Sequence, residues 1–482
     1  MQKLSDLGLF KQQCLVDGQW LDKPDVQEVY NPVDSSILGN VPNLDSSDIE
    51  RAIASAQKAF ELWRECLAVE RSNMLRRWHQ LILQHSDDLA RIITLEQGKP
   101  LKEAQGEIAY AASFVAWYAE QATRINGEIV PSHLPNSKIL IEKQPVGVVA
   151  AITPWNFPAA MMTRKCAPAI AAGCSVIVKP SPDTPFTALA LAELAQRAGF
   201  PKGLLQVVCG DAPEIGQQLC LSDQITKLSF TGSTNVGKLL MAQSAANVKR
   251  LSLELGGNAP FIVFDDADIE QALDGLMIAK FRNSGQTCVA ANRIFVQSGI
   301  YQLFSDALVA RVATLQVGSG LDNSDIAPLI HLEAAIKVKQ QVEDALKKGG
   351  ELLSGSIPSG QSNLLAPIVL ANANDEWLCS QQETFGPMVP LYRFDTEQEV
   401  IERANATESG LAAYAYSQDI ARCLRLANRL EAGMVGLNQG LLSSASAPFG
   451  GVKQSGLGRE GAEQGIEEYL ETKYVLLGGN VL

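Results

Sequence analysis

Hydrophobic positions recur at helical spacing through the first quarter of the chain. Residues 47–122 contain long Ala- and Leu-rich stretches such as IERAIASAQKAFELW and EIAYAASFVAWYAEQA, in which apolar residues return every three or four positions. Ser47 stands just before Asp48 and Glu50, an arrangement typical of a capped helix start. The pattern therefore predicts a helical segment over 47–122.

The pattern changes over residues 126–148. Short strand-like runs such as KILIEKQ are separated here by Gly127, Pro131, Pro135 and Asn136. Such a segment predicts a hairpin or arm. Strands at the edge of a large domain often pair with another subunit, so we expect this arm to take part in oligomerisation.

From residue 147 onward, buried-strand runs alternate with helical runs. VGVVAAI, CSVIVKP, LLQVVCG and ITKLSF predict strands, whereas FPAAMMTRKCAPAIAAG, TPFTALALAELAQRAG and IGQQLCL predict helices. The alternation continues through APFIVF, near 259, and ADIEQALDGLMIAKF to about 440, and the tail from 447 is Gly-rich, then helical (REGAEQGIEEYLETK), then strand-like (YVLLGG). Strands joined by crossover helices predict an α/β fold with a parallel sheet covered on both faces.

Length and charge narrow the class of protein. At roughly 100–200 residues per domain, 482 residues predict two to four units. The formal net charge of −13 disfavours nucleic acid or an anionic membrane as the main partner. No apolar run reaches the ~18–20 residues of a spanning helix, and the first residues lack a signal-peptide core. We therefore expect a cytoplasmic protein.

The nine cysteines and four histidines are widely spaced. The chain contains no C-x-x-C and no H-E-x-x-H, so we expect reduced thiols and no metal site.

Three separate residues could together carry nucleophilic catalysis. Cys288 lies in the polar, Gly-rich stretch FRNSGQTCVAANR, although an isolated cysteine is more often a buried small hydrophobe. Asn156, in TPWNFP, could stabilise an oxyanion or could be a turn residue before a proline. Glu254, in LSLELGGN, could be a base whose pKa burial raises, or an edge residue in solvent.

A Gly-rich turn joins a strand to a helix in KLSFTGSTNVGKLL. Such a turn exposes backbone N–H groups to an anion. The run from Gly232 to Lys238 resembles a P-loop, but Leu239 stands where magnesium ligation needs Ser or Thr. The dinucleotide-binding motif G-x-G-x-x-G is also absent. The turn is therefore either a phosphate-binding turn of neither standard type or a tight structural turn. Lys179, at the end of CSVIVKP, either faces the ligand crevice of the sheet or lies in solvent.

Taken in order, TPWNFP, KPSPDTP, FTGSTNVG, LELGGN, GQTC, ETFGP and PFGGVKQSG resemble the aldehyde dehydrogenase superfamily over roughly residues 10–480. The resemblance implies that Cys288 adds to the aldehyde. It further implies that Asn156 and the Cys288 N–H form the oxyanion hole, and that Glu254 activates water to hydrolyse the thioester.

The same resemblance implies NAD or NADP as the cofactor. The matched cofactor positions are Trp155, Lys179, Ser181, Gly232, Ser233, Leu255, Glu383 and Phe385. Pro182 stands where many relatives carry a residue that discriminates between the two cofactors. With Lys179 as a charge partner and Ser181 as a donor, we lean slightly to NADP tolerance.

FPAAMMTRK, FRNSGQTC, GLLSS, PFGGVKQSGLGREG and EEYLETKY resemble succinate-semialdehyde and glutarate-semialdehyde dehydrogenases. The match implies that Arg164, Arg282 and Ser443 hold the distal carboxylate of the substrate. Without the resemblance, Arg164 is better interpreted as a helix-face salt bridge and Arg282 as a helix C-terminal charge. A broad-specificity aliphatic or aromatic aldehyde dehydrogenase is the alternative. Ala290 stands where some relatives carry a second cysteine, so no disulfide switch is expected.

The expected architecture has three parts. Residues 1–122 and 147–254 are expected to form a Rossmann-like cofactor domain, 255–445 an α/β catalytic domain, and 123–146 with 446–482 a small β oligomerisation arm of a homodimer or homotetramer.

Three other functions compete with an aldehyde dehydrogenase. The first is a thiol acyltransferase or CoA-acylating dehydrogenase, which would not need Glu254 to activate water. The second is an ATP-binding protein that uses the Gly232–Lys238 turn, and the third is a non-catalytic structural relative.

Overall fold

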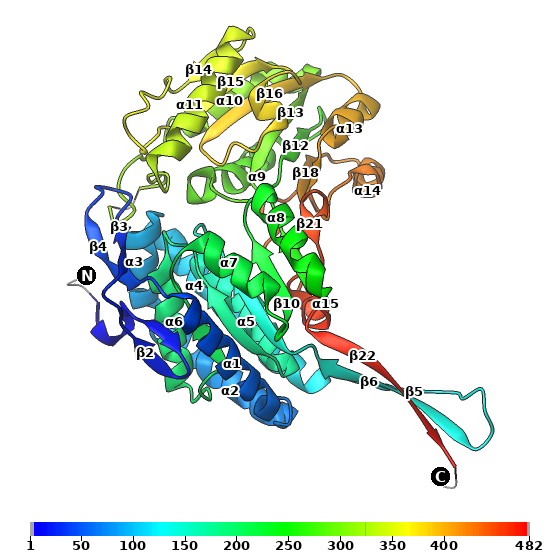
Figure 1. Ribbon diagram of the computed structural model, residues 1–482. Coiled ribbons are helices and arrows are strands. Elements are labelled where there is room, and N and C mark those ends of the chain that lie inside the picture. The colour runs from blue at the N-terminus through cyan, green and yellow to red at the C-terminus, as the bar shows by residue number, and fades with distance from the viewer. Residues whose placement is uncertain (1–3, 323, 480–482) are drawn as a thin grey trace.

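Two sheets with helices on both faces form the two lobes of the molecule in a computed structural model (Figure 1). The structure describes residues 4–322 and 324–479, so the extreme ends of the predicted domain ranges, 1–3 and 480–482, lie outside it. Among these described residues, none of the helices is long and apolar enough to cross a membrane.

The lower lobe in Figure 1 is built on an eight-stranded sheet of order β2-β1-β9-β8-β7-β10-β11-β21. Its strands are β1 (Cys14–Val16), β2 (Gln19–Leu21), β7 (Val148–Ile152), β8 (Ser175–Lys179), β9 (Leu205–Val207), β10 (Ile225–Thr231), β11 (Arg250–Glu254) and β21 (Gly456–Leu457). The five central strands, from β9 to β11, are parallel. Strand β8 is fully buried because helices cover both faces, which explains its continuous apolar sequence.

The predicted helical segment 47–122 consists of four helices. These are α1 (Ser46–Trp63), α2 (Ala68–Gln84), α3 (Ser86–Gln97) and α4 (Leu101–Gln121). The predicted cap is displaced: Asp45, not Ser47, caps α1, because its carboxylate accepts from the Asp48 N–H while Asp48 accepts in return from the Asp45 N–H. The crossover helices are α5 (Pro158–Ala172), α6 (Pro185–Arg197), α7 (Ala212–Leu221) and α8 (Thr234–Ser244).

The upper lobe contains a seven-stranded sheet of order β14-β15-β16-β13-β12-β18-β19, parallel except for β14. Its strands are β12 (Ala259–Val263), β13 (Ala291–Gln297), β14 (Glu351–Ser354), β15 (Ile368–Ala373), β16 (Met388–Phe394), β18 (Ala412–Tyr416) and β19 (Met434–Leu437). Its helices are α9 (Ile269–Phe281), α10 (Tyr301–Val312), α11 (Leu332–Lys347), α12 (Leu378–Gln381), α13 (Glu397–Asn405) and α14 (Ile420–Arg429).

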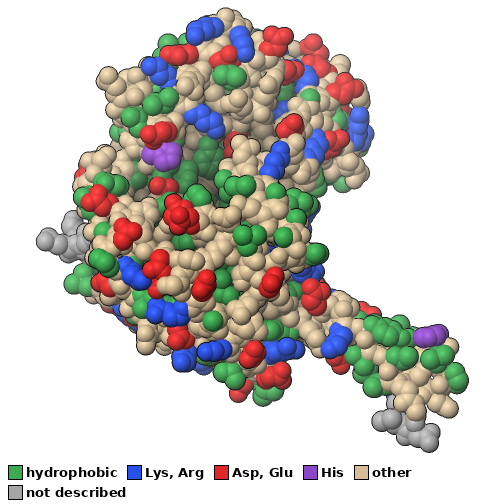
Figure 2. Space-filling view, viewed as in Figure 1, with side chains coloured by type: hydrophobic (Ala, Val, Ile, Leu, Met, Phe, Trp, Pro, Cys, Tyr) green, Lys and Arg blue, Asp and Glu red, His purple; other side chains and the backbone are tan. Residues whose placement is uncertain are grey.

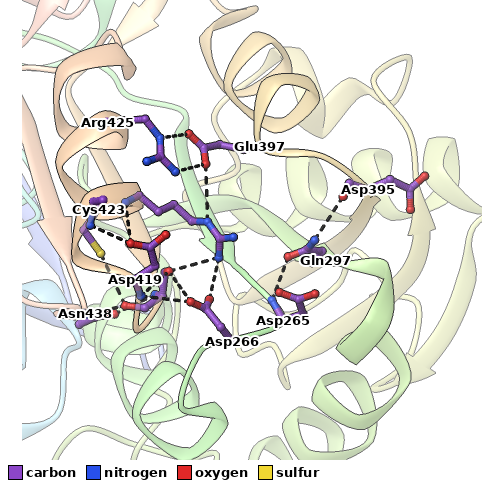
Figure 3. A network of polar contacts seen from close by, with 12 residues as sticks. Asp265, Asp266, Gln297, Asp395, Glu397, Asp419, Cys423, Arg425 and Asn438 are labelled. Carbon is purple, nitrogen blue, oxygen red and sulfur yellow. Dashed lines mark hydrogen bonds and ion pairs between the residues drawn. The ribbon is translucent and has the colours of Figure 1, made fainter.

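A polar network ties α13 and α14 to the loop after β12 (Figure 3). Glu397 accepts two bonds from Arg425, and Asp419 caps the first turn of α14. Arg422 bridges Asp266, at 2.9 Å, and Glu397, at 3.6 Å. These contacts lie at the surface, so they fix the helices without forming a buried charge.

A three-stranded arm projects from the lower lobe (Figure 1). It pairs β5 (Glu128–Val130) with β6 (Ser137–Pro145), and β6 with β22 (Leu470–Gly478). The predicted hairpin over 126–148 is therefore present. The tail helix is shorter than predicted: α15 (Ala462–Glu467) ends before Glu471–Lys473, because these residues pair with β6 in β22.

Only part of the C-terminal tail belongs to the sheet of the arm. Within the predicted arm range 446–482, β21 joins the large sheet beside β11, and β20 (Val452–Lys453) pairs with β17 (Ser409–Gly410). A short N-terminal pair, β3 (Val26–Tyr30) and β4 (Ile37–Pro42), completes the strands.

Candidate active site

A cavity of about 490 Å³ gathers side chains from both lobes, and Figure 2 shows the surface hollowed between them. All of the predicted site residues line this cavity except Lys179 and Ser181. The lining set comprises Trp155, Asn156, Arg164, Gly232, Ser233, Glu254, Leu255, Arg282, Cys288, Glu383, Phe385 and Ser443. Segments separated by up to several hundred residues thus meet where strand ends of the two sheets face one another.

Lys179 and Ser181 lie outside the cavity wall. Lys179 ends β8 and is buried, and its Nζ donates to the Pro180 carbonyl at 3.0 Å. Burial lowers its pKa, which Cys209, Asp183 and other nearby acids oppose. The Ser181 hydroxyl donates to Asp183 Oδ2 at 3.2 Å. The alternative that Lys179 is exposed to solvent is therefore wrong.

Cys288 lies in the loop between α9 and β13. Asn283 and Ser284 in this loop have φ of 52° and 56°, so the chain turns sharply before the cysteine. The backbone closes tightly on Gly257, where an added Cβ would lie 2.3 Å from the Cys288 carbonyl oxygen. Burial, reinforced by the charge of Glu254, raises the pKa of the Cys288 thiol to about 12. The thiol is therefore protonated at neutral pH and needs a nearby acceptor for its proton.

Asn156 follows β7 and is fixed through its backbone. Its carbonyl accepts from Lys99 Nζ at 2.6 Å and from Asn283 Nδ2 at 3.1 Å. Its own Nδ2 donates to the Gln286 carbonyl at 3.0 Å. The side-chain amide of Asn156 therefore lies against the loop that carries Cys288, with its N–H donors directed toward that loop.

Glu254 ends β11 and is 3% exposed, so the alternative that it is an edge residue in solvent is wrong. Burial raises the pKa of its carboxyl group to about 7, against the lowering effect of Arg164 and with an added increase from Glu460. A carboxyl group of this pKa exchanges protons readily near neutral pH.

Arg164 is already paired with a glutamate from the far end of the chain. Its Nε lies 2.6 Å from Glu460 Oε2, and Lys165 Nζ lies 2.5 Å from Glu460 Oε1. Arg164 Nη2 also lies 3.5 Å from Glu254 Oε2. Sequence reasoning missed Glu460, because nothing in the tail GLGREG marks a glutamate as the buried partner of a helix almost 300 residues away.

Arg282 differs from Arg164 in its surroundings. Among the described residues it forms no ion pair, and its guanidinium lies over the Phe157 ring, 5.3 Å from the centroid. Its Nη2 lies 3.5 Å from the Ser443 hydroxyl. Among the described residues, no carboxylate is therefore within ion-pair distance of the Arg282 guanidinium, and Glu103 is near enough only for a longer-range charge interaction.

The Gly-rich turn opens into the same cavity. Ser233 caps α8, its hydroxyl accepting from the Val236 N–H at 3.4 Å, and Gly232 lies just before it. Lys238 donates to Gln454 at 2.7 Å and does not line the cavity, which weakens the ATP-binding alternative. The helix N-terminus is thus open to an anionic group, without the lysine of a P-loop.

Glu383 faces this turn across the cavity. Its Oε1 accepts from the Gly257 N–H at 3.2 Å, and burial raises its pKa to about 7, opposed by Lys337. The Trp155 and Phe385 rings meet edge to face at 5.5 Å. A carboxylate, two aromatic rings and an open helix N-terminus are a set that suits the hydroxyls, flat ring and phosphates of a dinucleotide.

Sequence reasoning also missed part of the cavity wall. The other lining residues include Tyr110, Phe157, Met161, Thr287, Lys337 and Phe449. Tyr110 and Met161 lie inside long helices whose pattern indicates only packing, so no local signal distinguishes them from core residues.

Comparisons of the sequence and the fold with known proteins identify the family. Residues 20–475 match the model of the aldehyde dehydrogenase family. The chain is 54% identical to a succinate semialdehyde dehydrogenase of Acinetobacter baylyi, with 99% of each chain covered. It is 53% identical to a glutarate-semialdehyde dehydrogenase of Pseudomonas aeruginosa, with 99% of this chain and all of that one covered. A crystal structure of an Escherichia coli NADP-dependent enzyme superposes with a TM-score of 0.98 at 50% identity, covering 99% of this chain and all of the other. With its two α/β lobes and this cavity, the chain belongs to the aldehyde dehydrogenase family.

Proposed function

We propose that this chain oxidises succinate semialdehyde or glutarate semialdehyde to the dicarboxylate, with NAD or NADP as the hydride acceptor. One observation carries the choice of substrate. The cavity that contains Cys288 and Glu254 also contains Arg282, whose charge is unpaired among the described residues and which lies beside Ser443. An arginine without an ion-pair partner in this cavity favours a substrate that brings its own carboxylate.

Cys288 forms the covalent intermediate in this proposal. Its sulfur adds to the aldehyde carbon, and the thiol proton passes to Glu254, whose pKa of about 7 suits an acceptor. Asn156 Nδ2 and the Cys288 N–H donate to the oxyanion that forms. Loss of hydride then leaves a thioester on Cys288. Glu254 then releases the thiol proton to solvent and takes a proton from water, which attacks the thioester carbon. The carbon–sulfur bond breaks, the acid leaves, and Glu254 returns this second proton to the Cys288 sulfur.

NAD or NADP, when bound, accepts the hydride. Trp155, Gly232, Ser233, Leu255, Glu383 and Phe385 line the cavity and would hold it there, together with Lys179 and Ser181 outside the cavity wall. The fit is supported by the open N-terminus of α8 and by Gly256, where an added Cβ would lie 3.1 Å from Glu383 Oε2. Glu383 can accept from ribose hydroxyls.

Arg164 and Arg282 have different roles in binding the substrate in this proposal. Since Glu460 and Glu254 already neutralise it, Arg164 borders the substrate carboxylate and holds the two glutamates in place. Arg282 and Ser443 are the principal ligands of the carboxylate.

The presence of Glu254 favours hydrolysis of the Cys288 thioester over transfer of its acyl group to CoA. A CoA-acylating enzyme needs no base for water, whereas this carboxylate is buried in the cavity with a pKa near neutrality.

We also propose a homodimer or homotetramer assembled through the arm, and a cytoplasmic location. Apolar side chains on the arm are exposed, among them Ile129, Tyr474, Leu476 and Leu477. Figure 2 shows apolar side chains gathered on the projecting arm. All nine cysteines are unpaired, which fits a reducing compartment.

The test measures NAD(P)H formation with succinate semialdehyde, glutarate semialdehyde and uncharged butanal, each with NAD and NADP. We expect kcat/KM to favour the semialdehydes, and Arg282→Ala to lower kcat/KM for them about 100-fold, the effect of losing a charged hydrogen-bonding partner. Arg311→Ala on the outer helix α10 is the matched control. Equal or better activity on butanal in the parent protein would contradict the semialdehyde assignment and support the broad-specificity alternative.

A further inference from the structure

The hydroxyl group of Tyr110 is a buried donor without a partner. Tyr110 projects from α4 into the wall of the cavity. Its hydroxyl oxygen is buried and has no partner in hydrogen-bond geometry within the described part of the chain, although the Arg164 and Ser443 side chains lie close to it. Its ring is held by Phe114, 4.7 Å away between centroids. Because buried polar groups are nearly always paired, an unpartnered hydroxyl on a residue that lines a cavity indicates a missing ligand.

The groups around this hydroxyl are cationic or hydroxylic. Arg164 and Arg282 lower the pKa of Tyr110, but burial outweighs them and the pKa stays above its usual value. The phenol is therefore protonated and acts as a donor at neutral pH. The Arg164 and Ser443 side chains lie close enough to the phenolic oxygen for hydrogen bonding, which also lowers the pKa, and Ser443 neighbours Arg282 at 3.5 Å.

We propose that Tyr110 donates a hydrogen bond to the distal anionic group of the substrate, beside Arg282 and Ser443, and so helps to select anionic over neutral aldehydes. This inference rests on the proposed semialdehyde function. A carboxylate offers about four acceptor sites on its two oxygens. Two guanidinium N–H groups of Arg282 and the hydroxyls of Ser443 and Tyr110 supply four donors, whereas Arg164 is committed to Glu460.

The experiment compares Tyr110→Phe with Tyr118→Phe. Tyr118 is the matched control, because it lies two turns further along α4 and its hydroxyl is also buried without a partner, but it does not line the cavity. The measured quantity is the ratio of kcat/KM for succinate semialdehyde to kcat/KM for butanal. We expect Tyr110→Phe to lower this ratio about 10-fold or more, as for one lost hydrogen bond to a charged group. Tyr118→Phe should leave the ratio within about twofold of the parent value.

Product inhibition gives a second, independent reading. With butanal as the reporter substrate, succinate should inhibit the parent protein, and its inhibition constant should rise about 10-fold in Tyr110→Phe. Butyramide, which carries no carboxylate, should inhibit both proteins equally. An unchanged ratio together with an unchanged succinate constant in a normally folded Tyr110→Phe protein would overturn the role of Tyr110.

The two hypotheses fail in different ways. If the parent protein prefers semialdehydes and Arg282→Ala removes the preference, but Tyr110→Phe does not, the proposed function stands and the inference about Tyr110 is wrong. If the parent protein shows no preference for semialdehydes and no inhibition by succinate, the proposed function itself is wrong.

Discussion

At the scale of single residues, burial sets the protonation of Glu254. Burial raises its pKa to about 7, so the carboxyl group is protonated below this pH and a carboxylate above it. If the carboxylate is the base for water, turnover should rise with pH through about 7 and then level off. Thioester hydrolysis should be slow below that range, because the protonated group cannot accept a proton.

Glu254→Gln should remove this dependence on pH and lower turnover about 100-fold or more, within the usual range for a general base. The first burst of NAD(P)H should slow as well, because Glu254 accepts the Cys288 thiol proton before hydride is lost. Stopped-flow measurements give the burst rate and steady-state kinetics give turnover, each across the pH range. Unchanged turnover would remove Glu254 from the mechanism, and a burst at the parent rate would indicate that another group takes the proton of Cys288.

At the scale of elements, one buried ion pair joins two helices to Asn156. Glu107, on α4, accepts from the N–H groups of Ala159 and Ala160, at 2.9 and 3.3 Å, in the first turn of α5. Lys99 Nζ lies 2.6 Å from Glu107 and also donates to the Asn156 carbonyl. The start of α5 and the position of Asn156 therefore depend on the same carboxylate.

Glu107→Gln should lower the free energy of unfolding by about 3–5 kcal/mol, because it leaves Lys99 buried without a counter-charge. It should also lower kcat, since Asn156 loses its anchor. Denaturant unfolding and steady-state kinetics measure the two effects. Glu120→Gln on the same helix is the control: its pair with Arg76 is about half exposed and should contribute at most about 1 kcal/mol. Equal stability of the two variants would contradict the account.

At the scale of the whole molecule, the arm exposes apolar side chains that the two lobes do not cover. Tyr474 and Leu476 point to one face of β22, and they are 55% and 39% exposed. The arm projects away from the body in Figure 1, so a second copy of the chain could cover this face without disturbing either lobe. An uncovered apolar face on a projecting sheet is typical of an interface.

Tyr474→Asp combined with Leu476→Asp should shift the protein to a smaller species in sedimentation or light scattering, because two charges at an apolar interface are costly to bury. Leu62→Asp, at the 79% exposed position on α1, is the control and should leave the mass unchanged. A parent protein that is already monomeric, or an unchanged mass in the double variant, would refute assembly through this face.

The sequence by itself determined what depends on local pattern. Continuous apolar runs marked β7 and β8, because strands buried on both faces need no polar positions. Motifs with characteristic neighbours marked Cys288, Asn156 and Glu254, because each lies at a strand end or tight turn that the local sequence specifies. The residue that caps α1 did not follow from the local pattern, because Asp45 and Ser47 both suit a helix start. Only the backbone geometry distinguishes them.

The tertiary structure alone decided which charges are paired and which are buried. Arg164 and Arg282 are equivalent in the sequence, but Glu460 forms an ion pair with Arg164, and no carboxylate among the described residues lies within ion-pair distance of Arg282. The raised pKa of Glu254 and the orphan hydroxyl of Tyr110 likewise follow from side chains brought together from distant segments. The physical reason is that desolvation and ion pairing depend on distances in space, and local sequence pattern does not contain these distances.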